Sequence, residues 1–306
     1  MACAGLLALA VVPASAVGLR RGGTTAPLYD RTFKCERLER LSAPPELVVL
    51  GGSRAQRFEP SQIERLTGLP AFNFAVQNSR PEDAYAMARY LFWRAPDVKL
   101  RCIWAVQVTT LGDTPLHPGL LAEERLAQFL PDELVAAQRA AGAKVAAHEV
   151  LWSDEYSPRG ALFHNRYDRV EARGIGFDAV MQGYLARMLP KAGAPSPHEQ
   201  RRSKHYFERT LRLFNLHGVK PVLVIMPYHP KALAAFRAVG WQHKLDALNG
   251  YLQSLQGRYA FHLLDYTEIA SFGGSADGFY DGAHVKRQNA RRIVRQIVAD
   301  LPGAFR

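Results

Sequence analysis

The chain has 306 residues, of which 48% are hydrophobic and 22% are charged. This composition fits one large α/β domain or two small ones with a buried core, and it argues against large-scale disorder. The formal net charge of +11 favours acidic partners, whether nucleic acid, anionic glycan or anionic lipid. No helix-turn-helix, RNP or zinc-finger pattern accompanies the basic residues, so we expect no nucleic-acid partner.

Residues 2–17 form an apolar stretch that ends in the small residues Ala14-Ser15-Ala16. This pattern is typical of the apolar region and the A-x-A cleavage site of a secretory signal, although no Lys or Arg precedes it. We predict a signal peptide or membrane anchor at residues 1–16 and prefer cleavage after Ala16. The protein would then be periplasmic or anchored to the outer face of the inner membrane. A misassigned start codon is an open alternative.

Cysteine usage leaves two residues after the predicted signal, Cys35 and Cys102. In an oxidising periplasm they could form a disulfide between the segment before the first strand and a central strand. Two separate buried thiols are the equal alternative. No spacing of cysteines and histidines predicts a metal site, and we expect no cofactor.

The polar residues 17–43 predict an irregular lead-in, and a single domain is expected over residues 44–306. Short apolar runs predict five buried parallel strands: Glu46–Leu50, Phe72–Val76, Leu100–Val108, Pro221–Met226 and Phe261–Asp265. Helical patterns lie between them: Pro60–Thr67, Pro81–Trp93, Leu120–Ala140, Phe177–Leu189, His198–Leu216, Pro230–Gln256 and Val285–Leu301. This alternation predicts a three-layer αβα fold with a parallel, flavodoxin-like sheet of order 2-1-3-4-5. The long interval between the third and fourth strands predicts a helical insertion.

Two glycines and a serine follow the first predicted strand, where Val48–Leu50 leads into Gly51, Gly52 and Ser53. Glycines allow a sharp turn and a close backbone approach, and amides after such a turn can point at a developing oxyanion. The segment is compatible with a nucleophilic serine. An ordinary turn or a phosphate-binding loop would use the same residues.

Near the C-terminus, Asp281 and His284 stand three residues apart. At this spacing the carboxylate can orient one imidazole nitrogen while the other faces a serine, as a general base requires. Taken alone, Asp281 is equally well interpreted as a helix cap and His284 as a surface residue. The serine and this pair together are more specific, because strand ends in a parallel sheet meet at its carboxyl edge.

Gly51–Ser53 and Asp281–His284 resemble blocks I and V of the SGNH (GDSL-like) hydrolase superfamily, and the resemblance extends from Glu46 to the end of the chain. Within it, the chain looks most like exported, envelope-associated members related to the D-alanine transfer protein of lipoteichoic acid synthesis and to alginate O-acetylation proteins. The resemblance implies that Ser53 is the nucleophile, His284 the general base and Asp281 its orienting carboxylate.

The second and third blocks depart from the family pattern, which has an oxyanion-hole glycine in one and G-x-N-D in the other. Asn78 stands near the place of the glycine, and the third strand, through Thr110, contains no G-x-N-D. Loss of oxyanion donors predicts slow or absent hydrolysis unless other groups replace them. We assign Asn78 and Gln107 as candidate donors, with a turn residue and a strand residue facing a helix as the alternatives.

Two further residues are candidates for substrate binding. Arg54 directly follows Ser53 and could hold a carboxylate or a phosphate, or simply be solvated. His229 follows the fourth strand and therefore faces the same edge of the sheet.

The sequence therefore suggests a serine esterase or O-acyltransferase that acts on acyl groups of a cell-envelope polysaccharide through an acyl-serine intermediate. Its expected partners are an acylated glycan or other small ester and an envelope acyltransferase, with membrane proximity through the N-terminus. The alternative is a catalytically degenerate binding or assembly protein of envelope polysaccharide synthesis that keeps the SGNH fold.

Overall fold

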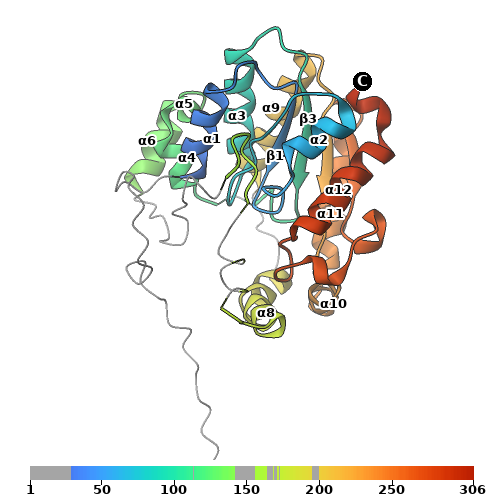
Figure 1. The fold of residues 1–306 in the computed structure, drawn as a ribbon. Helices are drawn as coiled ribbons and strands as arrows, with labels where there is room; N and C mark the ends of the chain where they lie inside the picture. The colour runs from blue at the N-terminus through green and yellow to red at the C-terminus, as the bar shows by residue number, and fades with distance from the viewer. Residues whose placement is uncertain are drawn as a thin grey trace, which may run out of the picture.

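The computed structural model describes residues 29–112, 114–141, 156–163, 168, 171, 173–194 and 200–306. The predicted signal peptide at residues 1–16 lies outside this part of the chain. A central sheet carries helices on both faces, as predicted (Figure 1). Among the described helices, none combines the length and the apolar character needed to cross a membrane.

Five strands form the sheet, and all of them are parallel, in the predicted order β2-β1-β3-β4-β5. They are β1 (Leu47–Gly51), β2 (Ala71–Asn73), β3 (Arg101–Val106), β4 (Val222–Ile225) and β5 (His262–Asp265). In the register of the three central strands, Gly51 lies opposite Ala105 and Val106 lies opposite Ile225. The segments that follow β1, β3 and β4 therefore leave the sheet side by side at its carboxyl edge.

The described helices divide between the two faces and the carboxyl edge of the sheet. They are α1 (Asp30–Glu39), α2 (Pro60–Thr67), α3 (Pro81–Arg94), α4 (Pro118–Ala122), α5 (Glu124–Ala127), α6 (Asp132–Ala140), α8 (Phe177–Gly193), α9 (Arg201–Leu216), α10 (Pro230–Ala238), α11 (Gln242–Leu255) and α12 (Arg287–Asp300), with the short 3-10 helices η4 (Ile269–Phe272), η5 (Ala276–Gly278) and η6 (Pro302–Phe305). The interval between β3 and β4 holds α4 to α9, which confirms the predicted helical insertion.

Two predicted helices are interrupted. Residues 120–140 form parts of α4, α5 and α6, because Glu123 is extended and Pro131 has no N–H to continue a helix. Residues 230–256 divide into α10 and α11 at Gly240, whose φ of +83° ends the first helix.

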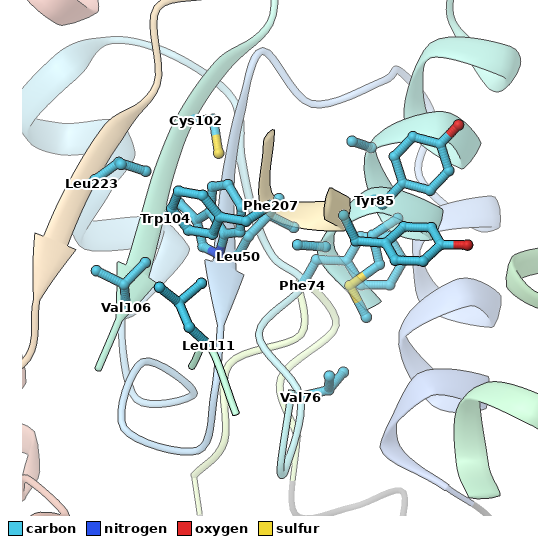
Figure 2. Close-up of a cluster of buried hydrophobic side chains, with 14 of the residues drawn as sticks. Leu50, Phe74, Val76, Tyr85, Cys102, Trp104, Val106, Leu111, Phe207 and Leu223 are labelled. Atoms are coloured by element: carbon cyan, nitrogen blue, oxygen red, sulfur yellow. The ribbon is translucent and has the colours of Figure 1, made fainter. Parts of the chain in front are cut away.

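Alternate side chains of each strand pack on opposite faces of the sheet, as strand geometry requires. Val48 and Leu50 belong to the larger cluster, which α3 and α9 cover, whereas Leu47 and Val49 belong to the cluster beneath α2 and α12. Figure 2 shows the larger cluster, in which the rings of Trp104 and Phe207 stack with centroids 4.5 Å apart. Apolar side chains therefore cover both faces of the sheet, and the strand ends are left as the place for a polar site.

The cysteines do not form a disulfide. Cys35 and Cys102 are both free and buried, and burial raises the pKa of each thiol well above its usual value. The disulfide alternative is wrong for this structure, and the alternative of two buried thiols is confirmed.

The predicted irregular lead-in is wrong for the part of residues 17–43 that the structure describes. Residues 30–39 form α1, which packs against α4, and its Cys35 and Leu38 join the larger core cluster. Its charged residues Asp30, Arg31 and Lys34 have no more than 1% of their surface exposed. A helix with buried charges has no apolar periodicity, which explains why the sequence pattern did not predict it.

Candidate active site

The nucleophile turn, residues 52–57, begins where β1 ends at Gly51. Gly51 has φ +129°, and a Cβ at this position would lie 2.5 Å from the carbonyl oxygen of Ala105 on the neighbouring strand. Only glycine fits this close approach. The chain can therefore turn immediately after the strand and present Ser53, which is half-buried, at the carboxyl edge of the sheet.

The second part of the site is a tight loop between η5 and α12. Phe279 and Val285 form an antiparallel bridge, and the Tyr280 N–H donates to the His284 carbonyl at 2.8 Å. Asp281 and His284 lie within this closed loop. Because α12 begins at Arg287 and its N-cap residue is Lys286, Asp281 does not cap that helix.

The structure joins Ser53, His284 and Asp281 in one hydrogen-bonded chain. Ser53 Oγ lies 3.0 Å from His284 Nε2. On the other side of the ring, His284 Nδ1 lies 2.9 Å from Asp281 Oδ2 and 3.0 Å from Oδ1. These contacts have the order and the distances that a serine nucleophile, a general base and an orienting carboxylate require.

Asp281 is held as an anion although only 1% of its surface is exposed. Burial by itself would raise the pKa of this carboxyl group. The His284 ring and the backbone N–H groups of His284 and Ala283, which both donate to Oδ1 at 2.8 Å, outweigh burial and keep the pKa well below its usual value. A fixed carboxylate of this kind selects the His284 tautomer that carries its proton on Nδ1.

His229 supports the loop that carries Asp281 and His284. Its backbone N–H donates to the Gly282 carbonyl at 3.0 Å, and its Nδ1 accepts from the Lys231 N–H at 3.1 Å, which caps α10. The ring contacts Phe279 with centroids 5.6 Å apart. His229 is 8% exposed. These contacts give it a structural role, and substrate contact stays a prediction.

Gln107 lies next to the nucleophile turn. It is the first residue after β3, and its Nε2 would be 3.6 Å from a Cβ built on Gly52. Its backbone N–H donates to Thr110 Oγ1 at 2.9 Å, which fixes the turn after the strand. The Gln107 side chain is therefore close to the nucleophile turn, and its role as an oxyanion donor stays a prediction.

We predict that Gln107→Ala lowers kcat for ester turnover by about 10²-fold with a smaller change in KM, because oxyanion donors act mainly in the transition state. Steady-state kinetics on a chromogenic ester would measure this. Thr109→Ala is the matched control, since Thr109 is exposed on the same turn. An equal loss in both variants would mean that the turn, and not the Gln107 amide, is responsible.

Asn78 is an exposed residue on the β2–α3 loop, residues 74–80. Its φ is +48°, and among the described residues it is the only one other than glycine with a positive φ. Asparagine tolerates this left-handed conformation better than most residues. The backbone at Asn78 thus has a conformation that glycine favours, and a donor role for Asn78 stays a prediction.

Arg54 is buried directly after Ser53, so the alternative of a solvated arginine is wrong. It is 7% exposed, and its guanidinium lies 4.0 Å from the centre of the Tyr228 ring. Nη1 makes a long hydrogen bond of 3.4 Å to the Met226 carbonyl. A permanent positive charge therefore lies beside the candidate nucleophile.

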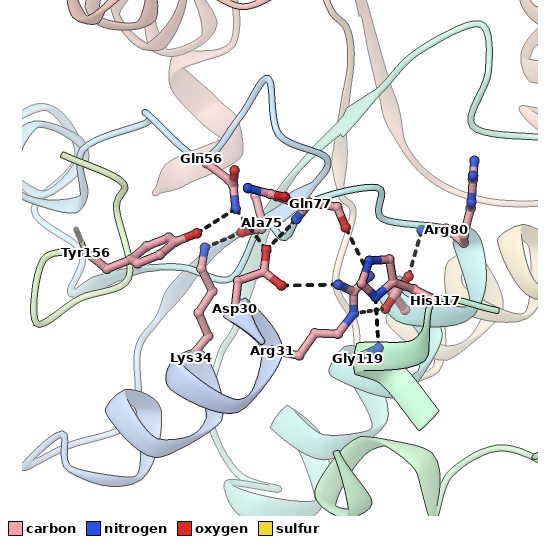
Figure 3. A network of polar contacts seen from close by, with 11 residues as sticks. Asp30, Arg31, Lys34, Gln56, Ala75, Gln77, Arg80, His117, Gly119 and Tyr156 are labelled. Atoms are coloured by element: carbon pink, nitrogen blue, oxygen red, sulfur yellow. Dashed lines mark hydrogen bonds and ion pairs between the residues drawn. The ribbon is translucent and has the colours of Figure 1, made fainter. Parts of the chain in front are cut away.

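The nucleophile turn and the β2–α3 loop are both anchored to α1 (Figure 3). Asp30 Oδ2 accepts from Gln56 Nε2 at 3.0 Å and from the Gln77 N–H at 2.5 Å. Arg31 donates to the Gln77 carbonyl at 3.1 Å. Since Gln56 lies in the nucleophile turn and Gln77 precedes Asn78, the charges of α1 fix these two segments relative to each other. Sequence reasoning missed this support.

Lys34 anchors the same loop from the next turn of α1. Its Nζ donates to the carbonyls of Asn73, at 3.1 Å, and Ala75. Complete burial lowers the pKa of this lysine from its usual 10.5 to about 7, although Asp30 counteracts the shift. The amine is therefore close to its titration point at neutral pH.

The lowered pKa makes the stability dependent on pH. Between pH 7 and 10.5 the unfolded chain holds a proton that the folded chain has released, so the free energy of unfolding rises with pH. Relative to Lys34→Met, wild type should gain roughly 1 kcal/mol per pH unit from pH 7 to 9. Urea unfolding of both proteins would measure the difference, with the exposed Lys99→Met as control. A difference that does not vary with pH would contradict it.

Residues of the nucleophile turn and of the loop around Asp281 contribute to the wall of an open pocket of about 450 Å³. Arg57, Tyr280 and Lys286 contribute to its wall. Asp168 links Arg57 to Tyr280. Arg57 Nη2 lies 2.5 Å from the Asp168 carboxylate, and the Tyr280 hydroxyl donates to the same carboxylate. The pocket offers an aromatic face together with charged donors and acceptors.

Comparisons with known proteins add little. No family model matches the sequence, and the search of curated proteins gave no match. A solved structure from Bacteroides fragilis, described as a "putative acylhydrolase", shares 10% sequence identity and has a TM-score of 0.40, over 90% of this chain and 96% of the other. A likeness of this degree carries no argument about function, which rests on the geometry of the site.

Proposed function

We propose that the protein is a serine esterase or O-acyltransferase of the SGNH type, with Ser53 as nucleophile, His284 as general base and Asp281 as orienting carboxylate. The observation that carries the proposal is the continuous chain of contacts from Ser53 Oγ through both ring nitrogens of His284 to Asp281. A serine needs an adjacent base to attack an acyl carbon at neutral pH, and this arrangement supplies one.

In the first half-reaction, Ser53 Oγ attacks the acyl carbonyl carbon and its proton passes to His284 Nε2. The tetrahedral intermediate collapses when the bond to the leaving alcohol breaks, and His284 gives the proton to that alcohol oxygen. An acyl-Ser53 ester remains. In the second half-reaction, a water or an acceptor hydroxyl loses its proton to His284 and attacks this ester. Ser53 recovers the proton from His284 as the acyl group departs.

The acyl group is proposed to come from, or be delivered to, a cell-envelope polysaccharide. The net charge of +11 favours an anionic polymer. The pocket beside the Asp281 loop supports a sugar-sized group, because it combines the Tyr280 ring with the charged side chains of Arg57 and Lys286. An exported location, suggested by residues 1–16, is part of the same proposal.

The proposal is tested by labelling purified protein with a fluorophosphonate probe and by assaying p-nitrophenyl acetate. Wild type should label and turn over, because the probe reacts with a serine that a base activates. Ser53→Ala should do neither. Peptide mapping of the labelled protein should place the adduct on Ser53, and His284→Ala should react far more slowly.

Ser61→Ala is the matched control, because Ser61 is an exposed serine on α2. If wild type neither labels nor turns over while remaining folded, the enzyme proposal is wrong and a binding or assembly role becomes the better explanation. Labelling that persists in Ser53→Ala would place the reactive group elsewhere.

A further inference from the structure

Three arginines are buried in the part of the chain that the structure describes, and Arg54 differs from the other two. Arg31 forms ion pairs with Asp30 and Asp83, at 3.1 and 2.8 Å. Arg57 forms one with Asp168. Arg54 has no carboxylate within ion-pair distance among the described residues. Burial alone would lower the pKa of this guanidinium, but Tyr228, Tyr184 and Asp281 outweigh burial and raise it. A buried charge that lacks a direct ion pair is costly, and proteins rarely keep one without a role.

The contacts of Arg54 leave some N–H groups of its guanidinium available to a further acceptor. The Tyr228 ring lies against the guanidinium, and the single carbonyl acceptor, Met226, is 3.4 Å away. A guanidinium carries five N–H donors in a rigid plane. Among the described residues, Met226 and Tyr228 account for two of these donors. Contact with the aromatic ring restricts the guanidinium, and its remaining N–H groups suit a bidentate acceptor.

The position of Arg54 limits where such a partner would lie. It is bonded directly to Ser53, whose Oγ contacts His284 at 3.0 Å. The Coulombic effect of Asp281 on Arg54 also puts the guanidinium near the candidate triad, so an acceptor on its N–H groups would lie close to the candidate nucleophile. Paired planar donors are well matched to carboxylate and phosphate oxygens.

We propose that Arg54 is a specificity-determining residue that binds an anionic group of the substrate, a carboxylate or a phosphate, next to the acyl carbonyl that Ser53 attacks. The inference rests on the proposed acyl-transfer function and makes it narrower. The preferred substrates are esters with a negative charge close to the reacting bond, in the acyl part or in the alcohol part.

The test compares kcat/KM for a neutral ester, p-nitrophenyl acetate, with that for an anionic ester, mono-p-nitrophenyl succinate. Wild type should prefer the succinate ester. Arg54→Gln should lower the ratio of the two values by about 10- to 100-fold, the range expected for hydrogen bonds between charged groups. Arg54→Lys should restore part of the ratio. Arg65→Gln, which removes an exposed cation on α2, should keep it.

A second measurement does not depend on turnover. NMR titration of Ser53→Ala with succinate, and separately with inorganic phosphate, should detect binding of at least one of them. The ion that binds identifies the preferred chemistry. Adding Arg54→Gln should abolish that binding.

The outcomes distinguish the proposed anion site at Arg54 from the proposed acyl-transfer function. Equal losses on both esters in Arg54→Gln would overturn the inference, because Arg54 would then act on the oxyanion or on the fold. Absence of anion binding to Ser53→Ala would also overturn it. If wild type hydrolyses neither ester but binds an anion through Arg54, the acyl-transfer proposal fails and the anion site stands.

Discussion

Replacing Asp281 by asparagine is expected to lower kcat/KM for ester turnover by about 10³- to 10⁴-fold while leaving the fold intact. The asparagine oxygen can still accept from the N–H groups of Ala283 and His284, which Asp281 Oδ1 now accepts at 2.8 Å. Its amide nitrogen would then face His284 Nδ1 and favour the tautomer that carries the proton on Nε2. That tautomer cannot take the proton of Ser53.

The measurement is kcat/KM on p-nitrophenyl acetate, together with thermal unfolding to show that the loop still closes. Asp97→Asn is the control, because Asp97 is an exposed acid at a turn away from this loop. It should keep activity within a few-fold of wild type. An Asp281→Asn protein that is nearly as active would show that His284 needs no orienting anion, and the triad interpretation would be wrong.

The inner strands were predictable from the sequence because they are apolar on both faces. Runs such as Val48–Leu50 and Val222–Ile225 are buried beneath helices on each side, and only a parallel sheet of an α/β fold demands this. The order 2-1-3-4-5 followed from the alternation of strands with helices. Helix breaks at Glu123 and Gly240 were missed, since single residues in extended or left-handed conformations hardly change an apolar pattern.

The three residues of the candidate triad were also predictable, because glycines before a serine and a closely spaced aspartate and histidine are local signals. The supports of the site were not. Gln56 and His229 act through contacts with Asp30 and Gly282, which are distant in sequence. Such pairings depend on tertiary structure, and no local pattern encodes them.

The segment before β1 was misread for a similar reason. Charged residues are normally exposed, so Asp30, Arg31 and Lys34 indicated a solvated lead-in. They are buried because backbone groups of the β2–α3 loop satisfy them, as the contacts of Gln77 show. One element supplies the charges and another supplies the partners, so neither sequence segment alone reveals the arrangement.

This arrangement predicts that Asp30→Ala lowers the free energy of unfolding by about 3–5 kcal/mol. The change leaves Lys34 buried without the nearby anion that offsets part of its desolvation, and it removes one of the two ion pairs of Arg31. The Gln77 N–H and the Gln56 amide also lose their acceptor. Urea unfolding would measure the loss, and Asp97→Ala, at an exposed turn position, should be within about 0.5 kcal/mol of wild type.

The Asp30→Ala variant also tests whether the charges of α1 stabilise the fold alone or hold the geometry of the candidate active site as well. Asp30 Oδ2 joins the nucleophile turn to the β2–α3 loop, so its loss should loosen both segments even well below the unfolding temperature. We therefore expect kcat to fall in the folded fraction of Asp30→Ala, with Asp30→Asn intermediate because one carboxamide oxygen remains as an acceptor. Unchanged kcat in a destabilised Asp30→Ala protein would confine the α1 charges to stability. A fall in kcat that follows the loss of stability from Asn to Ala would show that α1 holds the site in its reactive geometry.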